Sequence, residues 1–98
     1  MNKSYLKTKK GVVKVTFELP PAVEAKQAVL VGEFNNWDPS ATPMKRKKDG
    51  SFSAALTLES GKAYRYKYYL DSERWENDPN PDSLVPNIFG THDSVIST

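Results

Sequence analysis

Short segments in which apolar and polar residues alternate limit how this chain folds more than any other feature. Residues 13–19, 52–59 and 64–71 each place an apolar or aromatic side chain at every second position. This period matches a β-strand, in which successive side chains point to opposite faces of the sheet. Turn-forming pairs bound these segments, as at Asp49-Gly50 and Ser60-Gly61. The pattern therefore predicts an all-β chain folded as an antiparallel β-sandwich.

The remaining segments complete the predicted sandwich. Residues 27–34 indicate a central strand, because apolar side chains occupy both of its faces. Residues 42–47 predict a short strand that contains Met44, and residues 93–98 predict a closing strand. The prolines in residues 77–90 predict a loop, since proline cannot donate the hydrogen bond that a central strand requires.

The length of the chain fits one domain. Its 98 residues are enough to bury a single core without support from metals or disulfides. We expect the basic and polar residues 1–10 to form a flexible N-terminal segment and residues 11–98 to form the sandwich. No stretch has the apolar length of a signal peptide or a membrane span, and the expected location is the cytoplasm.

Charge and cysteine content narrow the function further. A formal net charge of +2 does not require nucleic acid or an acidic membrane as a partner. The absence of cysteine excludes a disulfide framework, a thiolate nucleophile and zinc-finger spacing. The basic run in residues 45–48 is compatible with phosphate binding, but it fits a charged hairpin arm that protects a sheet edge better. We therefore expect neither nucleic acid nor membrane as a partner.

Two tryptophans lie where turn-forming residues surround them. Trp37 follows Asn35 and Asn36, and Trp75 lies in a similarly polar stretch after a predicted strand. Two interpretations are open at this point: each indole fills a corner of the core, or it offers a flat apolar surface to a sugar ring. Covering one indole face would contribute about 2.5 kcal/mol, since it removes roughly 100 Å² of apolar area from water. Lys67 lies on the non-core face of its strand and would donate to sugar hydroxyls.

Four segments, taken in order, make the chain resemble a known family. They are residues 31–37, which read Val-Gly-Glu-Phe-Asn-Asn-Trp, and then residues 61–71, 75–79 and 90–95. The family is carbohydrate-binding module family 48, which includes the glycogen-binding domain of the AMP-activated protein kinase β-subunit and the N-terminal domains of isoamylases and glycogen-branching enzymes. The similarity runs from about Val12 to the C-terminus. It implies an immunoglobulin-like β-sandwich of the early-set type that binds α-1,4-linked glucans without catalysis.

The resemblance also implies which residues contact the glucan. Two indoles and a lysine form the platform, an apolar residue reaches over the glucan, and polar groups contact its hydroxyls; in this sequence the positions are Trp37, Lys67, Trp75, Phe89, Thr91 and Asp93. Asp93 stands where glycogen-binding members carry asparagine, and an ionised carboxylate can only accept hydrogen bonds. Phe89 replaces a smaller aliphatic residue, and the turn at residues 71–74 is one residue longer.

Other functions fit the sequence less well. The carboxylates of Asp71, Glu73, Glu76 and Asp78 could serve glycoside hydrolysis, which uses an acid and a second carboxylate. A sandwich of this size has little room for a deep cleft, so we interpret them as a solvated acidic loop. The spacing of these residues does not match a calcium-binding loop. We expect a chain that is not an enzyme and that binds no metal or cofactor.

The expected partner is therefore an α-glucan polysaccharide or a malto-oligosaccharide. A glucan-modifying enzyme or a kinase is a further expected partner, because family members work beside such proteins. The alternative is a module that docks on a protein or serves as a structural accessory domain, with a vestigial sugar site. Retention of Trp37, Lys67 and Trp75 together argues against that alternative.

Overall fold

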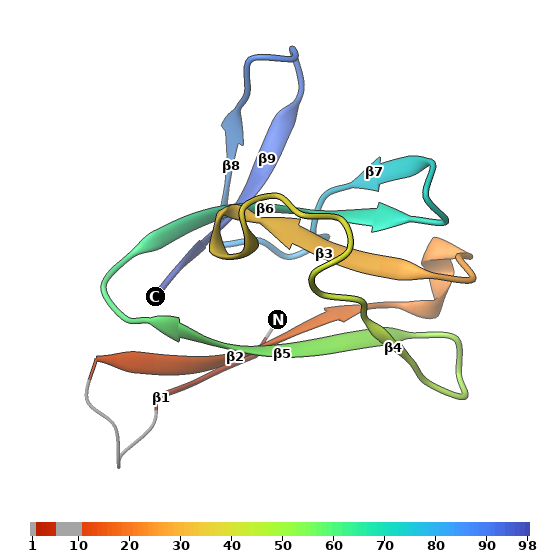
Figure 1. Ribbon diagram of the computed structural model, residues 1–98, viewed down its shortest axis with the longest axis horizontal. Coiled ribbons are helices and arrows are strands. Elements are labelled where there is room, and N and C mark those ends of the chain that lie inside the picture. Colours follow the sequence, from red (N-terminus) through yellow and green to blue (C-terminus); the bar gives the residue numbers. More distant parts are fainter. Residues whose placement is uncertain (1, 6–10) are drawn as a thin grey trace.

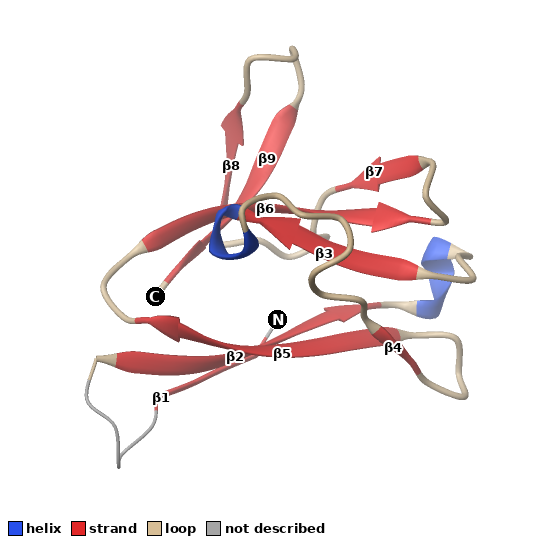
Figure 2. Cartoon of the chain, in the orientation of Figure 1, coloured by secondary structure: helices blue, strands red, loops and turns tan. Residues whose placement is uncertain are grey.

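Two antiparallel sheets face each other in the computed structural model, which describes residues 2–5 and 11–98 (Figures 1 and 2). One sheet has the strand order β1-β2-β5-β4, and the other has the order β3-β6-β9-β8, with β7 also paired to β6. The strands are β1 (Asn2–Tyr5), β2 (Val12–Leu19), β3 (Ala28–Gly32), β4 (Lys45–Arg46), β5 (Phe52–Glu59), β6 (Ala63–Leu70), β7 (Arg74–Glu76), β8 (Ser83–Pro86) and β9 (His92–Ser97). Two single-turn 3₁₀ helices, η1 (Pro21–Val23) and η2 (Glu33–Asn35), follow β2 and β3. The all-β immunoglobulin-like sandwich predicted from the sequence is confirmed.

The core lies between the sheets and is built from the alternating apolar positions. On β2, Val13, Val15, Phe17 and Leu19 are all buried, as the period of two predicts. From the other sheet, β6 contributes two fully buried tyrosines and Leu70, and β3 and β9 contribute Leu30 and Ile96. Met44 is buried and precedes the short strand β4, which covers only part of the strand expected at residues 42–47.

Three segments differ from the sequence-based expectation. Residues 28–32, expected as a central strand, form β3 at the edge of its sheet. Residues 83–86, expected in a loop, form β8 at the edge of a sheet and pair antiparallel with β9. Pro86 is tolerated there because it ends an edge strand, where a missing donor breaks no central ladder. At the other end of the chain, Asn2–Tyr5 pairs with residues 13–16 of β2. That strand occupies part of the expected flexible segment 1–10, of which Met1 and residues 6–10 lie outside the described residues.

A buried carboxylate fixes the segment between β7 and β8. Asp78, expected in a solvated acidic loop, is only 4% exposed and accepts hydrogen bonds from the hydroxyls of Tyr66 (2.6 Å) and Tyr68 (3.2 Å). Burial raises the pKa of both tyrosine hydroxyls, because it disfavours the charged phenolate. Asp78 raises these pKa values further, chiefly through its hydrogen bond at Tyr66 and its charge at Tyr68. The amide of Asp78 donates to Ser94 Oγ of β9 at 2.9 Å. The expectation of a solvated Asp78 is therefore wrong, because the folded chain places it against two core tyrosines.

Gly32 ends β3 at a point where no side chain fits. A Cβ at this position would lie 2.6 Å from the carbonyl oxygen of Arg65, 2.8 Å from Tyr66 Cβ and 2.9 Å from Phe34 Cζ. Two of these atoms belong to or adjoin the backbone of β6, so they cannot move without shifting the strand. We therefore expect Gly32→Ala to lower the free energy of unfolding by about 2 kcal/mol. Urea denaturation of the two proteins measures this loss, and an unchanged midpoint would contradict the close approach.

Candidate functional site

Strand β6 pairs with two different strands along one edge, and the candidate site lies where the pairing changes. Residues 63–66 of β6 pair with β9, whereas residues 68–70 pair with β7 on the same edge. Lys67 lies between these two pairings, and β3 runs along the opposite edge with Val31 in register with Lys67. Figure 1 shows the β8–β9 hairpin and the β6–β7 hairpin diverging from each other beyond this point. Since Tyr66 and Tyr68 point into the core, Lys67 points to the outer face of the sheet.

Trp75 lies on the same outer face and is supported from one side. It is directly opposite Tyr69 in the β6–β7 pairing, and the two rings stack with centroids 4.3 Å apart at an interplanar angle of 29°. The Tyr69 hydroxyl donates to the carbonyl oxygen of Ser72 at 2.7 Å, which holds the phenol in place. Trp75 is still 50% exposed. One face of the indole is thus covered by Tyr69, and its remaining surface is available to a ligand.

The turn before Trp75 is closed by backbone contacts. Asp71 and Ser72 both adopt the left-handed conformation, with φ of 52° and 54°, and Glu73 N–H donates to the carbonyl oxygen of Leu70 at 3.1 Å. The Asp71 carboxylate accepts hydrogen bonds from the amides of Gln27 and Lys26, both at 2.9 Å. The hydrogen bond from the Gln27 amide has the largest effect, and together with that from Lys26 it holds the pKa of Asp71 below its usual value. The longer turn expected at residues 71–74 therefore closes tightly, and its fourth residue, Arg74, begins β7.

Trp37 occupies a strained turn after η2. Trp37 and Asn36 have φ of 56° and 57°. Asparagine tolerates this left-handed region, whereas it costs a residue such as tryptophan about 1–2 kcal/mol. Trp37 N–H donates to the carbonyl oxygen of Gly32 at 2.8 Å. The Asn35 side chain accepts from Gly32 N–H at 3.0 Å and donates to Leu30 O at 2.9 Å. Asn35 thus fixes the turn, and such strain is concentrated at binding sites.

Trp37 and Trp75 are attached along opposite edges of β6, one on each side of Lys67. Trp37 is bonded to Gly32, which is in register with Tyr66, and Trp75 is in register with Tyr69. Three residues along β6 and two strand spacings across the sheet separate the two attachment points, which gives roughly 14 Å. Neither indole belongs to the core, because Trp37 is 38% and Trp75 is 50% exposed.

Polar groups surround Lys67 on the side of β9. Its Nζ atom lies 3.3 Å from Thr91 Oγ1 and 4.0 Å from Asp93 Oδ1. Asp93 Oδ2 lies 3.6 Å from Arg65 Nη1, so this carboxylate lies between two cations. The side chains of Lys67 and Asp93 are only 14% and 11% exposed. The structure thus brings together the predicted polar residues Lys67, Thr91 and Asp93, and the lysine contacts the other two.

Asn87 organises the tip of the β8–β9 hairpin, a role that the sequence analysis missed. Its amide nitrogen donates to Thr91 Oγ1 at 2.8 Å and to Asp93 Oδ1 at 3.0 Å, and its oxygen accepts from Phe89 N–H at 3.0 Å. Phe89, which the resemblance placed over the glucan, is 83% exposed in this tip, and Ile88 is 93% exposed. An asparagine three residues before a glycine is a usual turn signal, and it could have indicated this role.

Comparison with known proteins identifies the class of protein that this arrangement represents. A β-sandwich with exposed aromatic side chains around hydrogen-bonding groups is typical of modules that bind a ligand on an open surface. Residues 7–87 match the family described as carbohydrate-binding module 48 (isoamylase N-terminal domain). The chain belongs to this family. The match ends at Asn87, so Phe89, Thr91 and Asp93 lie beyond it.

Related proteins contain this domain within longer chains. The 1,4-alpha-glucan branching enzyme of Aquifex aeolicus is 36% identical over 64 residues, which cover 64% of this chain and 10% of that enzyme. The 5'-AMP-activated protein kinase subunit beta-2 of Mus musculus is 32% identical over 71 residues, which cover 72% of this chain and 24% of that subunit. The chain therefore spans between a tenth and a quarter of the length of these relatives.

Two further findings concern features that a membrane-spanning helical protein or a metal-binding protein would need. Within residues 2–5 and 11–98, no helix has the length and apolar character to span a membrane. The same residues contain no group of three or more histidine, aspartate or glutamate side chains placed to hold a metal ion.

Proposed function

We propose that this chain binds α-1,4-linked glucan on the outer face of β6, without catalysis. The observation that carries this proposal is the pair of exposed indoles attached on either side of Lys67. Each indole would stack on the C–H face of a glucose ring and contribute about 2.5 kcal/mol. Two such contacts, less the cost of immobilising the oligosaccharide, give an affinity in the millimolar to micromolar range.

The polar groups would bind the rim of the sugar. The ammonium of Lys67 has three donors, of which one is directed at Thr91 and a second faces Asp93, so the third is available to a glucan hydroxyl. Asp93 would accept from a hydroxyl while its second oxygen faces Arg65, and Thr91 would exchange its contact with Lys67 for one with the sugar. Phe89 would close over the chain from the hairpin tip.

The surroundings of the carboxylates support a binding role rather than hydrolysis. A glycosidase needs two carboxyl groups facing one scissile bond. Asp71 is bonded to backbone amides, and Asp78 is buried against tyrosines, so neither faces a substrate. Two of the four carboxylates considered from the sequence therefore make hydrogen bonds that stabilise the fold.

The relatives suggest where such a module works. Because the matching segments belong to a glucan branching enzyme and a kinase subunit, we infer that this chain localises a glucan-modifying enzyme or a kinase to α-glucan in the cytoplasm. The alternative is a module that docks on such a protein with a vestigial sugar site.

A binding panel distinguishes the two. Equilibrium binding to glycogen, amylose, cyclodextrin and cellulose should show binding to the α-linked ligands and none to cellulose. Because stacking on sugars is nearly independent of salt, the affinity should persist at high ionic strength, unlike phosphate-driven binding to nucleic acid. Absence of binding to all four would favour the protein-docking module.

Tyr69 is expected to position Trp75. Tyr69→Ala removes the ring against which the indole stacks, so we expect glucan affinity to fall about fivefold, corresponding to roughly 1 kcal/mol for the aromatic pair. Tyr69→Phe keeps the ring and loses the hydroxyl bond to Ser72, and should stay within about twofold of the parent. Titration with maltoheptaose, monitored by tryptophan fluorescence, measures both affinities. Equal affinities for Tyr69→Ala and the parent would show that Trp75 holds its orientation without support.

A further inference from the structure

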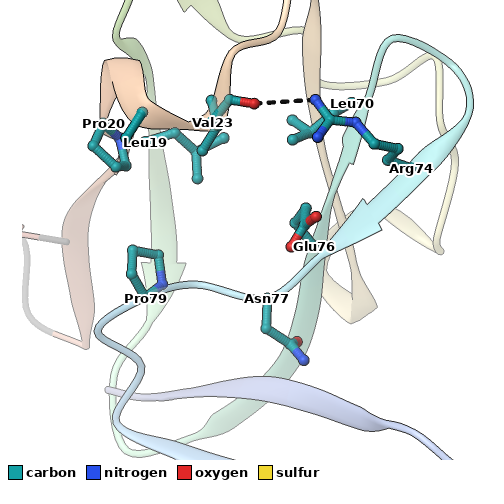
Figure 3. A pocket seen from close by; sticks show the side chains of 9 residues that line it. Leu19, Pro20, Val23, Leu70, Arg74, Glu76, Asn77 and Pro79 are labelled. Carbon is teal, nitrogen blue, oxygen red and sulfur yellow. Dashed lines mark hydrogen bonds between the residues drawn. The ribbon is translucent and has the colours of Figure 1, made fainter.

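A cavity of about 330 Å³ lies at the end of the sandwich, away from the outer face of β6. We call it the end cavity; its lining includes Leu19, Pro20, Val23, Arg74, Glu76 and Pro79 (Figure 3). Leu19 is a core residue, only 1% exposed, so the floor of the end cavity is apolar and fixed. Nothing in the proposed glucan platform uses these groups.

β7 separates the end cavity from the glucan platform. Along this short strand Trp75 faces outward with Tyr69, whereas Arg74 and Glu76 are in register with Leu70 and Tyr68, which point to the other side. Figure 3 shows Arg74 and Glu76 extending from β7 on one side of the end cavity, with Pro20, Val23 and Pro79 across from them. One strand of three residues thus presents side chains to two separate sites.

The polar wall of the end cavity offers both an acceptor and a donor. Arg74 Nη2 donates to the carbonyl oxygen of Val23 at 3.0 Å, which ties β7 to η1 (Figure 3). Among the described residues, the other guanidinium nitrogens have no hydrogen-bond acceptor and the Glu76 carboxylate has no hydrogen-bond donor. The opposite wall carries two proline rings, whose saturated C–H surfaces are apolar.

Neighbouring hydroxyls on one edge and an apolar C–H surface would complement these two walls. We propose that the end cavity is a second saccharide site, which takes one glucose unit of an α-glucan. Glu76 accepts hydrogen bonds from two neighbouring hydroxyls, Arg74 donates to a third oxygen, and the pyranose ring packs against Pro20 or Pro79. The inference rests on the proposed function for the choice of glucan as ligand.

A second site would change how the module holds a polymer. A branched glucan presents several chains, so one chain can occupy the platform while another enters the end cavity. Binding at two sites raises the effective affinity for the polymer well above that for either short oligosaccharide. Glycogen should therefore be bound more tightly, per chain, than maltose.

Amide chemical-shift mapping with maltose tests the end cavity. The variant Trp37→Ala/Lys67→Ala removes most of the platform and leaves all of β7 unchanged. At millimolar maltose, we expect the amides of Val23 and Glu76 to shift in both the parent and this variant, and the amides of Arg65 and Thr91 to shift in the parent only. Adding Glu76→Gln should raise the half-saturation concentration for the cavity amides about tenfold, because one of two carboxylate acceptors is lost. Glu73→Gln, a change at an exposed carboxylate outside the end cavity, should not alter it.

The possible results separate the two proposals. If the platform amides shift in the parent and the cavity amides shift in neither protein, the second site is wrong and the proposed function stands. If no amide shifts in the parent, both are wrong. A response of the cavity amides to a lysine-containing peptide but not to maltose would overturn the saccharide assignment, since Glu76 would then bind a cation.

Discussion

Asp78→Ala should lower the free energy of unfolding by about 3 kcal/mol, the largest effect that we expect from a single substitution. The carboxylate is 4% exposed and accepts hydrogen bonds from two core tyrosines and from Asn80 N–H, at 2.6, 3.2 and 2.9 Å. Hydrogen bonds to a charged group are worth about 1.5–3 kcal/mol, and alanine would also leave a void beside the phenols. Denaturant unfolding monitored by circular dichroism measures the loss.

Two further variants separate this effect from a general loss of charge. Asp78→Asn keeps one acceptor oxygen and should cost less than alanine. Glu73→Ala removes an exposed carboxylate and should change stability by no more than about 0.5 kcal/mol. Equal stabilities of Asp78→Ala and Glu73→Ala would contradict a structural role for the buried carboxylate.

Trp75→Ala should weaken binding of maltoheptaose about 30-fold, which corresponds to about 2 kcal/mol, and leave the fold intact. The indole is half exposed and contributes nothing to the core, so its loss removes ligand-stacking surface rather than core packing. Isothermal titration gives the affinity, and thermal unfolding gives the stability.

Leu84→Ala is the matched control for this substitution. Leu84 is 51% exposed, almost the same as Trp75, but it lies on β8 and is not part of the platform. It should bind the ligand as the parent does, within about twofold. A loss of folding in Trp75→Ala, or an equal loss of binding in both variants, would show that exposure rather than the platform determines the effect.

The sequence predicted the fold well in segments where the spacing of the apolar residues alone determines the structure. The buried positions of β2 and β6 follow from simple alternation, and the same alternation places Lys67 on the outer face. The strand β8 was missed because its segment is rich in proline, and only pairing with β9 reveals an edge strand.

The exposure of the two tryptophans was predictable from the sequence, but the contacts among the candidate residues were not. Trp37 and Trp75 were identified as exposed candidates from their polar, turn-forming surroundings. The support of Trp75 by Tyr69 depends on strand register, and the pairing of Asp93 with Lys67 joins residues of different strands. Asp78 was misplaced in solvent because nothing local shows that two core tyrosines approach it. Neither the spacing of apolar residues nor the turn-forming residues indicate tertiary contacts of this kind.

The central claim is that two exposed indoles bind α-glucan together. Calorimetric titration of maltoheptaose into the parent and into Trp37→Ala/Trp75→Ala tests it most directly. If the two contacts of about 2 kcal/mol add, affinity should fall roughly a thousandfold and leave no measurable heat, while the double variant still unfolds cooperatively. A folded double variant that binds maltoheptaose as tightly as the parent would contradict the claim.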